Sequence, residues 1–188
     1  RQNKTLEQMA ETLFRQWLLD FDRTTTLAEY IKVQSGYAFK SKDFLETGTF
    51  GIVKITNISF DSIDIENTQF VSESLALSIN DKFYIKPGSF LIAMTGAEIG
   101  KIGIVGINTK NLLLNQRVGM LVDKLEHSSV IGYMFLKSKE GQDHIINTAS
   151  GSAQPNISTY GIEEMEVPFK SESEQVKIID QLSPLFEK

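Results

Sequence analysis

Apolar side chains near the start of the chain recur at steps of three and four residues. Polar side chains such as Glu7, Glu11 and Arg15 occupy the positions between them. No glycine or proline interrupts residues 5–21, so the pattern predicts an amphipathic helix of about five turns. Its apolar stripe consists of Leu6, Met9, Leu13, Trp17 and Phe21. A stripe of this width predicts that the helix packs against a partner surface.

The middle of the chain has a different pattern of short runs rich in Val, Ile, Phe and Thr. Turn-forming residues such as Asp61, Pro87 and Asn108 separate these runs. This alternation predicts a sheet of several short strands. The runs occupy residues 31–39, 51–58, 69–71, 90–94, 102–107 and 118–122.

Helical spacing returns after the strand-rich region. Residues 129–146 read as a helix with a weak point at Gly141. A loop of small and amide residues follows at 151–158, and then a short strand at 164–167 ends at Pro168.

The last predicted element is a second amphipathic helix. It begins at Ser171 or Ser173, where the spacing fits a capping box. Pro184 should bend or break it, because proline cannot continue the hydrogen-bond ladder. Its apolar stripe consists of Val176, Ile179, Leu182 and Phe186.

These elements predict an α+β protein in which a compact mixed-sheet domain is flanked by amphipathic N- and C-terminal helices. We place the first helix at 1–23, the sheet domain at 24–169 and the start of the last helix at 170–188. The two helices should pack together or against another copy, since neither is stable alone in water. The expected contact residues are Leu13, Trp17, Phe21, Ile179 and Leu182.

The composition limits the class of protein. The 188 residues suffice for one domain with a core, and the absence of cysteine excludes disulfides and thiolate metal sites. No apolar run approaches the ~18 residues of a membrane span. These features favour a cytoplasmic protein without a membrane partner. Because the chain begins at Arg1 rather than Met, we expect either a fragment or a chain whose beginning is missing.

The net charge of −5 argues against binding to nucleic acid, which normally requires a basic surface. The charges are unevenly distributed, however. Acidic residues concentrate between 161 and 188, whereas Lys32, Lys40, Lys42 and Lys54 cluster early. The acidic end therefore predicts a helix that faces something other than a nucleic acid.

No motif in the sequence predicts catalysis, a cofactor or a metal. The spacing of Gly96 and Gly100 is one residue too short for a phosphate-binding loop, and Ile102 replaces the hydroxyl that would follow Lys101. His127 and His144 have no acidic companion at ligand spacing. We therefore assign no catalytic or metal-binding residue and no cofactor.

Basic and aromatic residues near turns are candidates for binding. Tyr37, Lys40 and Lys42 share a glycine-containing segment, and Lys54 and Lys101 each lie near a predicted turn. Lysines in such places can contact phosphates. The alternative for the segment at 35–42 is a plain solvated turn.

Amide and guanidinium groups form a second set of candidates: Asn115, Gln116, Arg117, Gln154 and Asn156. Arginine can grip guanine, and asparagine or glutamine can grip adenine, through two hydrogen bonds each. The alternatives are an edge strand with buried partners at 115–117 and a simple cap at 154–156. The combination of such segments in one chain favours a recognition surface.

Several of these segments together resemble the specificity subunits of type I restriction-modification systems, over nearly the whole chain. The helix at 6–21 is similar to the conserved helix that precedes a target-recognition domain in that family. Later segments resemble the domain itself and the entry to the next conserved helix; they lie at 35–41, 87–103, 115–119, 151–158 and 167–175.

The resemblance implies sequence-specific recognition of double-stranded DNA, with one domain reading one half of a bipartite target. It also implies a coiled coil of long helices that spaces two half-sites, and no enzymatic activity of its own. Methylation (M) subunits and, through them, restriction (R) subunits would be the partners, with a homodimer possible for a half-length subunit. The alternative is a protein-interaction module without a DNA surface, which docks partner subunits through its apolar helices.

Overall fold

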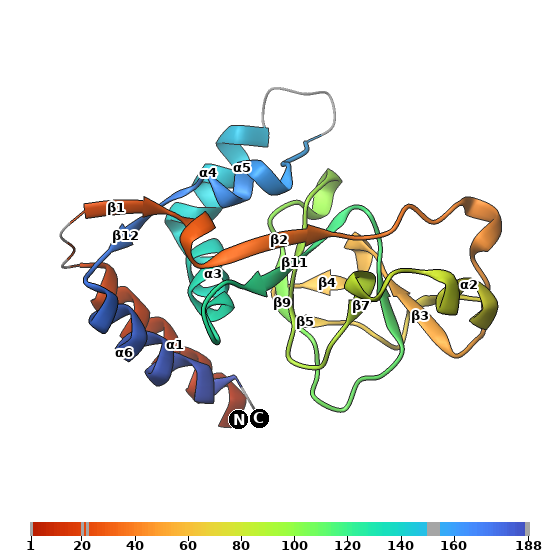
Figure 1. Cartoon of the computed structure of the whole chain (residues 1–188), viewed down its shortest axis with the longest axis horizontal. Coiled ribbons are helices and arrows are strands. Elements are labelled where there is room, and N and C mark those ends of the chain that lie inside the picture. The colour runs from red at the N-terminus through yellow and green to blue at the C-terminus, as the bar shows by residue number, and fades with distance from the viewer. Residues whose placement is uncertain (1, 20, 22, 150–154, 187–188) are drawn as a thin grey trace.

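The computed structural model describes residues 2–19, 21, 23–149 and 155–186 (Figure 1). Its helices are α1 (Gln2–Leu18), α2 (Glu73–Ser78), α3 (Ser129–Lys137), α4 (Lys139–Ala149), α5 (Thr159–Glu163) and α6 (Glu172–Leu182). Its strands are β1 (Arg23–Thr26), β2 (Ile31–Ser35), β3 (Phe50–Val53), β4 (Ile58–Ser59), β5 (Asp61–Ile63), β6 (Gln69–Val71), β7 (Tyr84–Ile85), β8 (Phe90–Ala93), β9 (Ile102–Ile104), β10 (Leu112–Leu114), β11 (Val118–Asp123) and β12 (Glu166–Phe169). Over these ranges, no helix combines the length and the apolar character needed to cross a membrane.

The strands form two main sheets and one short ribbon. The six-stranded sheet has the order β2-β11-β8-β9-β5-β4, and the four-stranded sheet has the order β6-β3-β10-β7. Each sheet contains one parallel pair, β5 with β9 and β3 with β10, among antiparallel pairs. Strands β1 and β12 pair with each other and connect the terminal helices to this strand-rich body. The predicted α+β class with mixed sheets is confirmed.

The six-stranded sheet is buried on both faces, as its central strand β8 illustrates. Phe90 and Ile92 point toward the cluster that contains the helices. Leu91 and Ala93 point the other way, toward the four-stranded sheet. Because successive side chains of a strand alternate between faces, a strand covered on both sides reads as one continuous apolar run.

The four-stranded sheet repeats this arrangement one layer further out. Leu112 and Leu114 of β10 face the six-stranded sheet. Leu113 faces a third cluster, in which Phe39 and Ala76 cover the outer side. The segment around Phe39 is thereby fixed to the sheet by its own apolar side chains.

The two terminal helices pack together, as predicted. Helices α1 and α6 lie side by side and antiparallel, with both chain ends at the same end of the pair (Figure 1). Their buried side chains belong to one cluster with α3: Ala10, Phe14, Trp17, Ile178, Ile179 and Leu182. Leu13 is partly buried against the same cluster.

The stripe on α1 is rotated and shorter than predicted. Met9 is 50% exposed, and Phe21 is 48% exposed because α1 ends at Leu18 and Phe21 lies beyond it. On α6, Val176 is 54% exposed. The broad apolar face of each helix allows several packing angles, and the partner helix buries only one stripe. We predicted that Phe21 would pack against the last helix, but it is half-exposed beyond the end of α1.

The helix predicted at 129–146 is two helices, α3 and α4. The break lies at Ser138, whose backbone is extended, and not at Gly141. The Ser138 hydroxyl accepts a hydrogen bond from the Gly141 N–H at 3.2 Å and so caps α4. A Cβ at Gly141 would lie 2.2 Å from the Phe135 carbonyl oxygen. Gly141 thus permits the close turn between the helices and does not weaken a continuous one.

Candidate functional site

Two of the polar segments meet through backbone hydrogen bonds. The Tyr37 N–H donates to the Leu114 carbonyl at 2.8 Å, and the Gln116 N–H donates to the Tyr37 carbonyl at 3.0 Å. The segment that follows β2 therefore lies directly beside the turn between β10 and β11. Residues nearly 80 positions apart in the chain become neighbours.

The same line of backbone contacts continues to two further segments. The Arg117 carbonyl accepts from the Met94 N–H at 3.0 Å, and the Met94 carbonyl accepts from the Ile157 N–H at 2.9 Å. Thr95 then forms a bridge with Asn156. We call this line of residues the polar row; it consists of Tyr37, Thr95, Asn115, Gln116, Arg117 and Asn156. Gln154, predicted for the same surface, lies outside the described residues.

Within the row, the three residues of the turn at 115–117 have different roles: one shapes the turn and two are exposed. The Asn115 side-chain oxygen accepts from the Arg117 N–H at 3.2 Å, and the Val118 N–H donates to the Asn115 carbonyl at 2.9 Å. Asn115 therefore shapes its own turn, as asparagine commonly does. Gln116 and Arg117 are exposed at its tip.

Tyr37 is held by neighbouring rings. Its ring lies edge-on to Phe39, with 4.9 Å between centroids, and to Phe83 at 5.7 Å. Edge-to-face pairs of this kind stabilise by about 0.5–1.5 kcal/mol beyond the area that they bury. Tyr37 is half-buried, and these ring contacts fix its side chain within the row.

The four predicted lysines fall into two groups. Lys40 and Lys42 are exposed on the turn that follows Phe39. Lys54 donates from Nζ to the Gln69 side chain at 2.7 Å, and its ammonium lies 5.4 Å from the Phe44 ring centroid. Lys101 forms an ion pair with Glu98. Two of the four therefore already have protein partners.

The turn at 95–101 was not among the predicted site residues, except for Lys101. It adjoins the row through the Gly96 N–H, which donates to the Pro155 carbonyl at 2.9 Å. Gly96 and Gly100 both have positive φ, of 74° and 83°. Only glycine adopts this conformation without strain, so the paired glycines were the available signal for a shaped turn.

A helix fixes the other end of that turn. The Gln142 side-chain N–H₂ of α4 donates to the Gly100 carbonyl at 2.9 Å and to the Leu136 carbonyl at 2.7 Å. The turn is thus tied to the α3–α4 junction as well as to the row. Among the residues that the structure describes, no cluster of His, Cys, Asp or Glu could hold a metal ion.

Comparison with known proteins gives one family and several solved structures. A family model described as "Type I restriction modification DNA specificity domain" matches residues 22–188. The type I restriction-modification S subunit from M. genitalium aligns with a TM-score of 0.61 and 23% identity, over 97% of this chain and 47% of that chain. The HsdS subunit from Thermoanaerobacter tengcongensis aligns with a TM-score of 0.56 and 17% identity, over 97% of this chain and 44% of that one.

The chain spans less than half the length of each of these subunits. At such identities the likeness shows a shared fold. The comparison with curated proteins found no match.

Proposed function

Since the chain belongs to the family of type I restriction-modification DNA specificity domains, we propose that it reads one half of a bipartite double-stranded DNA target through the polar row. The observation that carries the proposal is the convergence of exposed amide and guanidinium groups from separate segments on one line of backbone contacts. Residues 24–169 would form the recognition domain, between helical segments at 1–23 and 170–188.

The exposed residues of the row have the chemistry that base reading requires. Arg117 can donate two hydrogen bonds to guanine, and Gln116 or Asn156 can pair with adenine in the same way. Asn115 and Tyr37 would hold these groups in position. Gln154 would belong to the same surface.

The distribution of charge is compatible with DNA binding at the polar row despite the net charge of −5. Glu172, Glu174 and Asp180 lie on α6, at the opposite end of the molecule from α2 and β3 (Figure 1). Lys40 and Lys42 lie between β2 and β3, on the strand-rich part. These lysines follow Tyr37 of the polar row by three and five residues, so they would be available to a duplex bound there.

We propose that the domain is not catalytic and acts in the cytoplasm within a larger complex. Methylation subunits would dock on the α1/α6 pair, and restriction subunits would join through them. A second copy of the chain could supply the other half-site. The competing function is a docking module without DNA contact, which the net charge favours; salt-dependent duplex binding separates the two.

The direct test is selection of bound duplexes from a random pool, with the partner methylation subunits present. Enrichment of one short sequence, with affinity that falls steeply as salt rises, would support target recognition. Binding of the partner subunits without any enriched sequence would favour the docking module instead.

Replacing Lys40 or Lys42 with alanine should weaken binding to all duplexes alike. Each change should reduce the slope of log affinity against log salt by about one unit, because one phosphate contact is lost. Lys177→Ala is the matched control, since it removes the same charge from an exposed site on α6. Lys54→Ala and Lys101→Ala should have smaller effects, because each lysine must leave a protein partner to reach a phosphate. An unchanged slope for Lys40 and Lys42 would remove both from the DNA surface.

Replacing Arg117 or Gln116 with alanine should relax the preference at one base pair of the selected target. The expected loss of discrimination is about 1–3 kcal/mol for each bidentate contact. Competition among duplexes that differ at single positions measures it. Arg117→Lys keeps the charge, but a lysine cannot donate the paired hydrogen bonds of a guanidinium to guanine. This variant should therefore lose discrimination as well. A fall in melting temperature with preference intact would assign these residues a structural role instead.

A further inference from the structure

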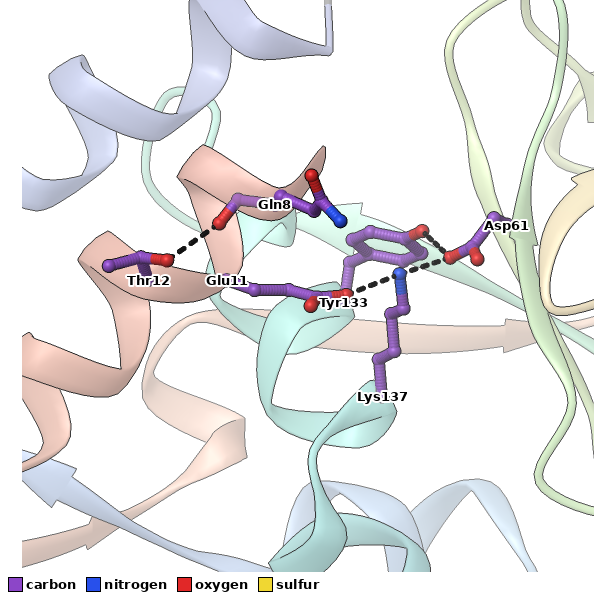
Figure 2. A network of polar contacts seen from close by, with 6 residues as sticks. All are labelled: Gln8, Glu11, Thr12, Asp61, Tyr133 and Lys137. Carbon is purple, nitrogen blue, oxygen red and sulfur yellow. Dashed lines mark hydrogen bonds and ion pairs between the residues drawn. The ribbon is translucent and has the colours of Figure 1, made fainter. Parts of the chain in front are cut away.

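A half-buried ionic cluster joins three elements that are distant in sequence. Lys137, at the end of α3, lies between the carboxylates of Glu11 from α1 and Asp61 from β5 (Figure 2). The distance from Lys137 Nζ to Glu11 Oε1 is 2.9 Å, and Asp61 is also in direct contact with Nζ. Only 15% of the Lys137 side chain is exposed. We call Glu11, Asp61 and Lys137 the clasp.

Asp61 is aimed at this cluster by an unusual backbone conformation. Its φ is +72°, in the left-handed region, which costs most residues about 1–2 kcal/mol and which aspartate tolerates better. The Tyr133 hydroxyl, one turn before Lys137 on the same face of α3, donates to Asp61 Oδ1 at 2.9 Å. Two side chains of one helix therefore hold one carboxylate of the sheet.

Lys137 is the positive charge that holds the two carboxylates of the clasp together. Burial raises the pKa of Glu7 and the nearby carboxylates of Asp61 and Glu11 raise it further, whereas the charge of Lys137 lowers it. Burial alone would lower the pKa of Lys137, but its hydrogen bonds to Asp61 and Glu11 outweigh that effect, and its pKa is raised. A protonated Lys137 thus separates acidic groups that would otherwise repel one another across the contact.

Aromatic rings pack beside the clasp. The Tyr133 ring stacks on Phe90 with 4.4 Å between centroids, and the Phe186 ring lies edge-on to Tyr133 at 5.3 Å. Such ring pairs prefer particular geometries, but these two join α3 to β8 and to the segment after α6, and neither includes a residue of α1. The ionic contacts impose specific distances between α1, α3 and β5.

We propose that Lys137 is a positioning residue: through Glu11 and Asp61 it fixes the orientation of the α1/α6 pair relative to the sheets that carry the polar row. The consequence for DNA rests on the proposed function, because this orientation sets where a bound half-site lies relative to the helices. Removing the clasp leaves the shared apolar cluster and the β1–β12 ribbon as the contacts that hold the helix pair, so its orientation becomes less sharply defined while the sheet domain stays folded.

The test measures the distance between α1 and the far side of the strand-rich body. Because the sequence contains no cysteine, Gln16→Cys and Leu77→Cys would carry spin labels at two exposed sites and nowhere else. The parent chain should give one narrow distance distribution. Lys137→Met should broaden it to about twice its width or split it, as expected for a freed rigid-body motion. Glu11→Gln should broaden it as well.

Two control variants separate positioning from a general loss of charge. Lys139→Met removes a lysine that pairs at 3.2 Å with Asp143 inside α4, and it should leave the distribution unchanged. Lys137→Arg keeps the charge and the donors, so it should restore the narrow distribution. A narrow distribution in a folded Lys137→Met variant would overturn the proposal. If Lys137→Met does not fold, Glu11→Gln decides, since its side chain is 43% exposed and tolerates replacement.

Duplex binding is measured separately on the same variants. Affinity for an isolated half-site should stay within about threefold of the parent, because the polar row is untouched. Failure of the parent chain to bind any duplex would overturn the proposed function and leave the distance result standing. Equal distributions in parent and clasp variants would overturn the clasp and leave DNA recognition standing.

Discussion

Replacing Trp17 with alanine should lower the free energy of unfolding by about 3–5 kcal/mol, the cost typical of emptying a large buried aromatic site. Trp17 is 7% exposed and stacks on Phe14 with 5.6 Å between ring centroids. It lies in the cluster shared by α1, α3 and α6. A cavity here would therefore loosen both terminal helices from α3.

Urea denaturation followed by circular dichroism measures this effect. Leu19→Ala is the matched control, because Leu19 directly follows α1 but is 80% exposed, and it should change stability by less than about 0.5 kcal/mol. The Trp17 indole N–H is buried without a hydrogen-bond partner among the described residues. Trp17→Phe should consequently cost much less than Trp17→Ala. A loss below about 1 kcal/mol for Trp17→Ala would contradict the enclosed packing.

Replacing Gly36 with alanine should destabilise the domain by about 1–3 kcal/mol and disrupt the polar row. An added Cβ would lie 2.1 Å from the Leu114 carbonyl oxygen and 2.4 Å from the Asn115 carbonyl carbon. These atoms belong to the backbone and cannot rotate away. The contact of Tyr37 with Leu114 and Gln116 would have to open, so sequence preference should weaken together with stability.

Gly106→Ala is the control for this change. Its added Cβ would meet only the Thr109 hydroxyl, at 3.4 Å, and its φ is not in the left-handed region. It should leave both the melting temperature and the duplex preference close to those of the parent. A Gly36→Ala variant with unchanged stability would show that the two segments are held less closely than a Cβ approach of 2.1 Å to the Leu114 carbonyl oxygen implies.

The prediction of elements from the sequence succeeded where one local pattern was sufficient. The three- and four-residue periodicity identified α1 and α6, and α6 ends at Leu182, just before Pro184, because proline cannot extend the helix. It failed for β10, whose three leucines give no alternation because both of their faces are covered. It also joined α3 and α4, since nothing local marks Ser138 as a break.

In the candidate site, too, the sequence predicted the types of residue but not their partners. The sequence identified amide, guanidinium and lysine side chains near turns, because those residue types rarely serve a core. It could not show that Lys54 binds Gln69 or that Thr95 pairs with Asn156. These partners come from other segments, and the sequence carries no signal for which segments meet.

The sequence by itself determined that a helix lies near each end of the chain, that the centre is rich in strands, and which chemical types of side chain are exposed. Periodicity and side-chain chemistry are local properties. The tertiary structure alone decided which stripe of α1 is buried, which lysines are already paired and that Glu11, Asp61 and Lys137 form one cluster. Each of these depends on how two sheets and two helices are stacked. That stacking brings together side chains as far apart as residues 11 and 137, whose ionic contact requires both to reach the same half-buried position.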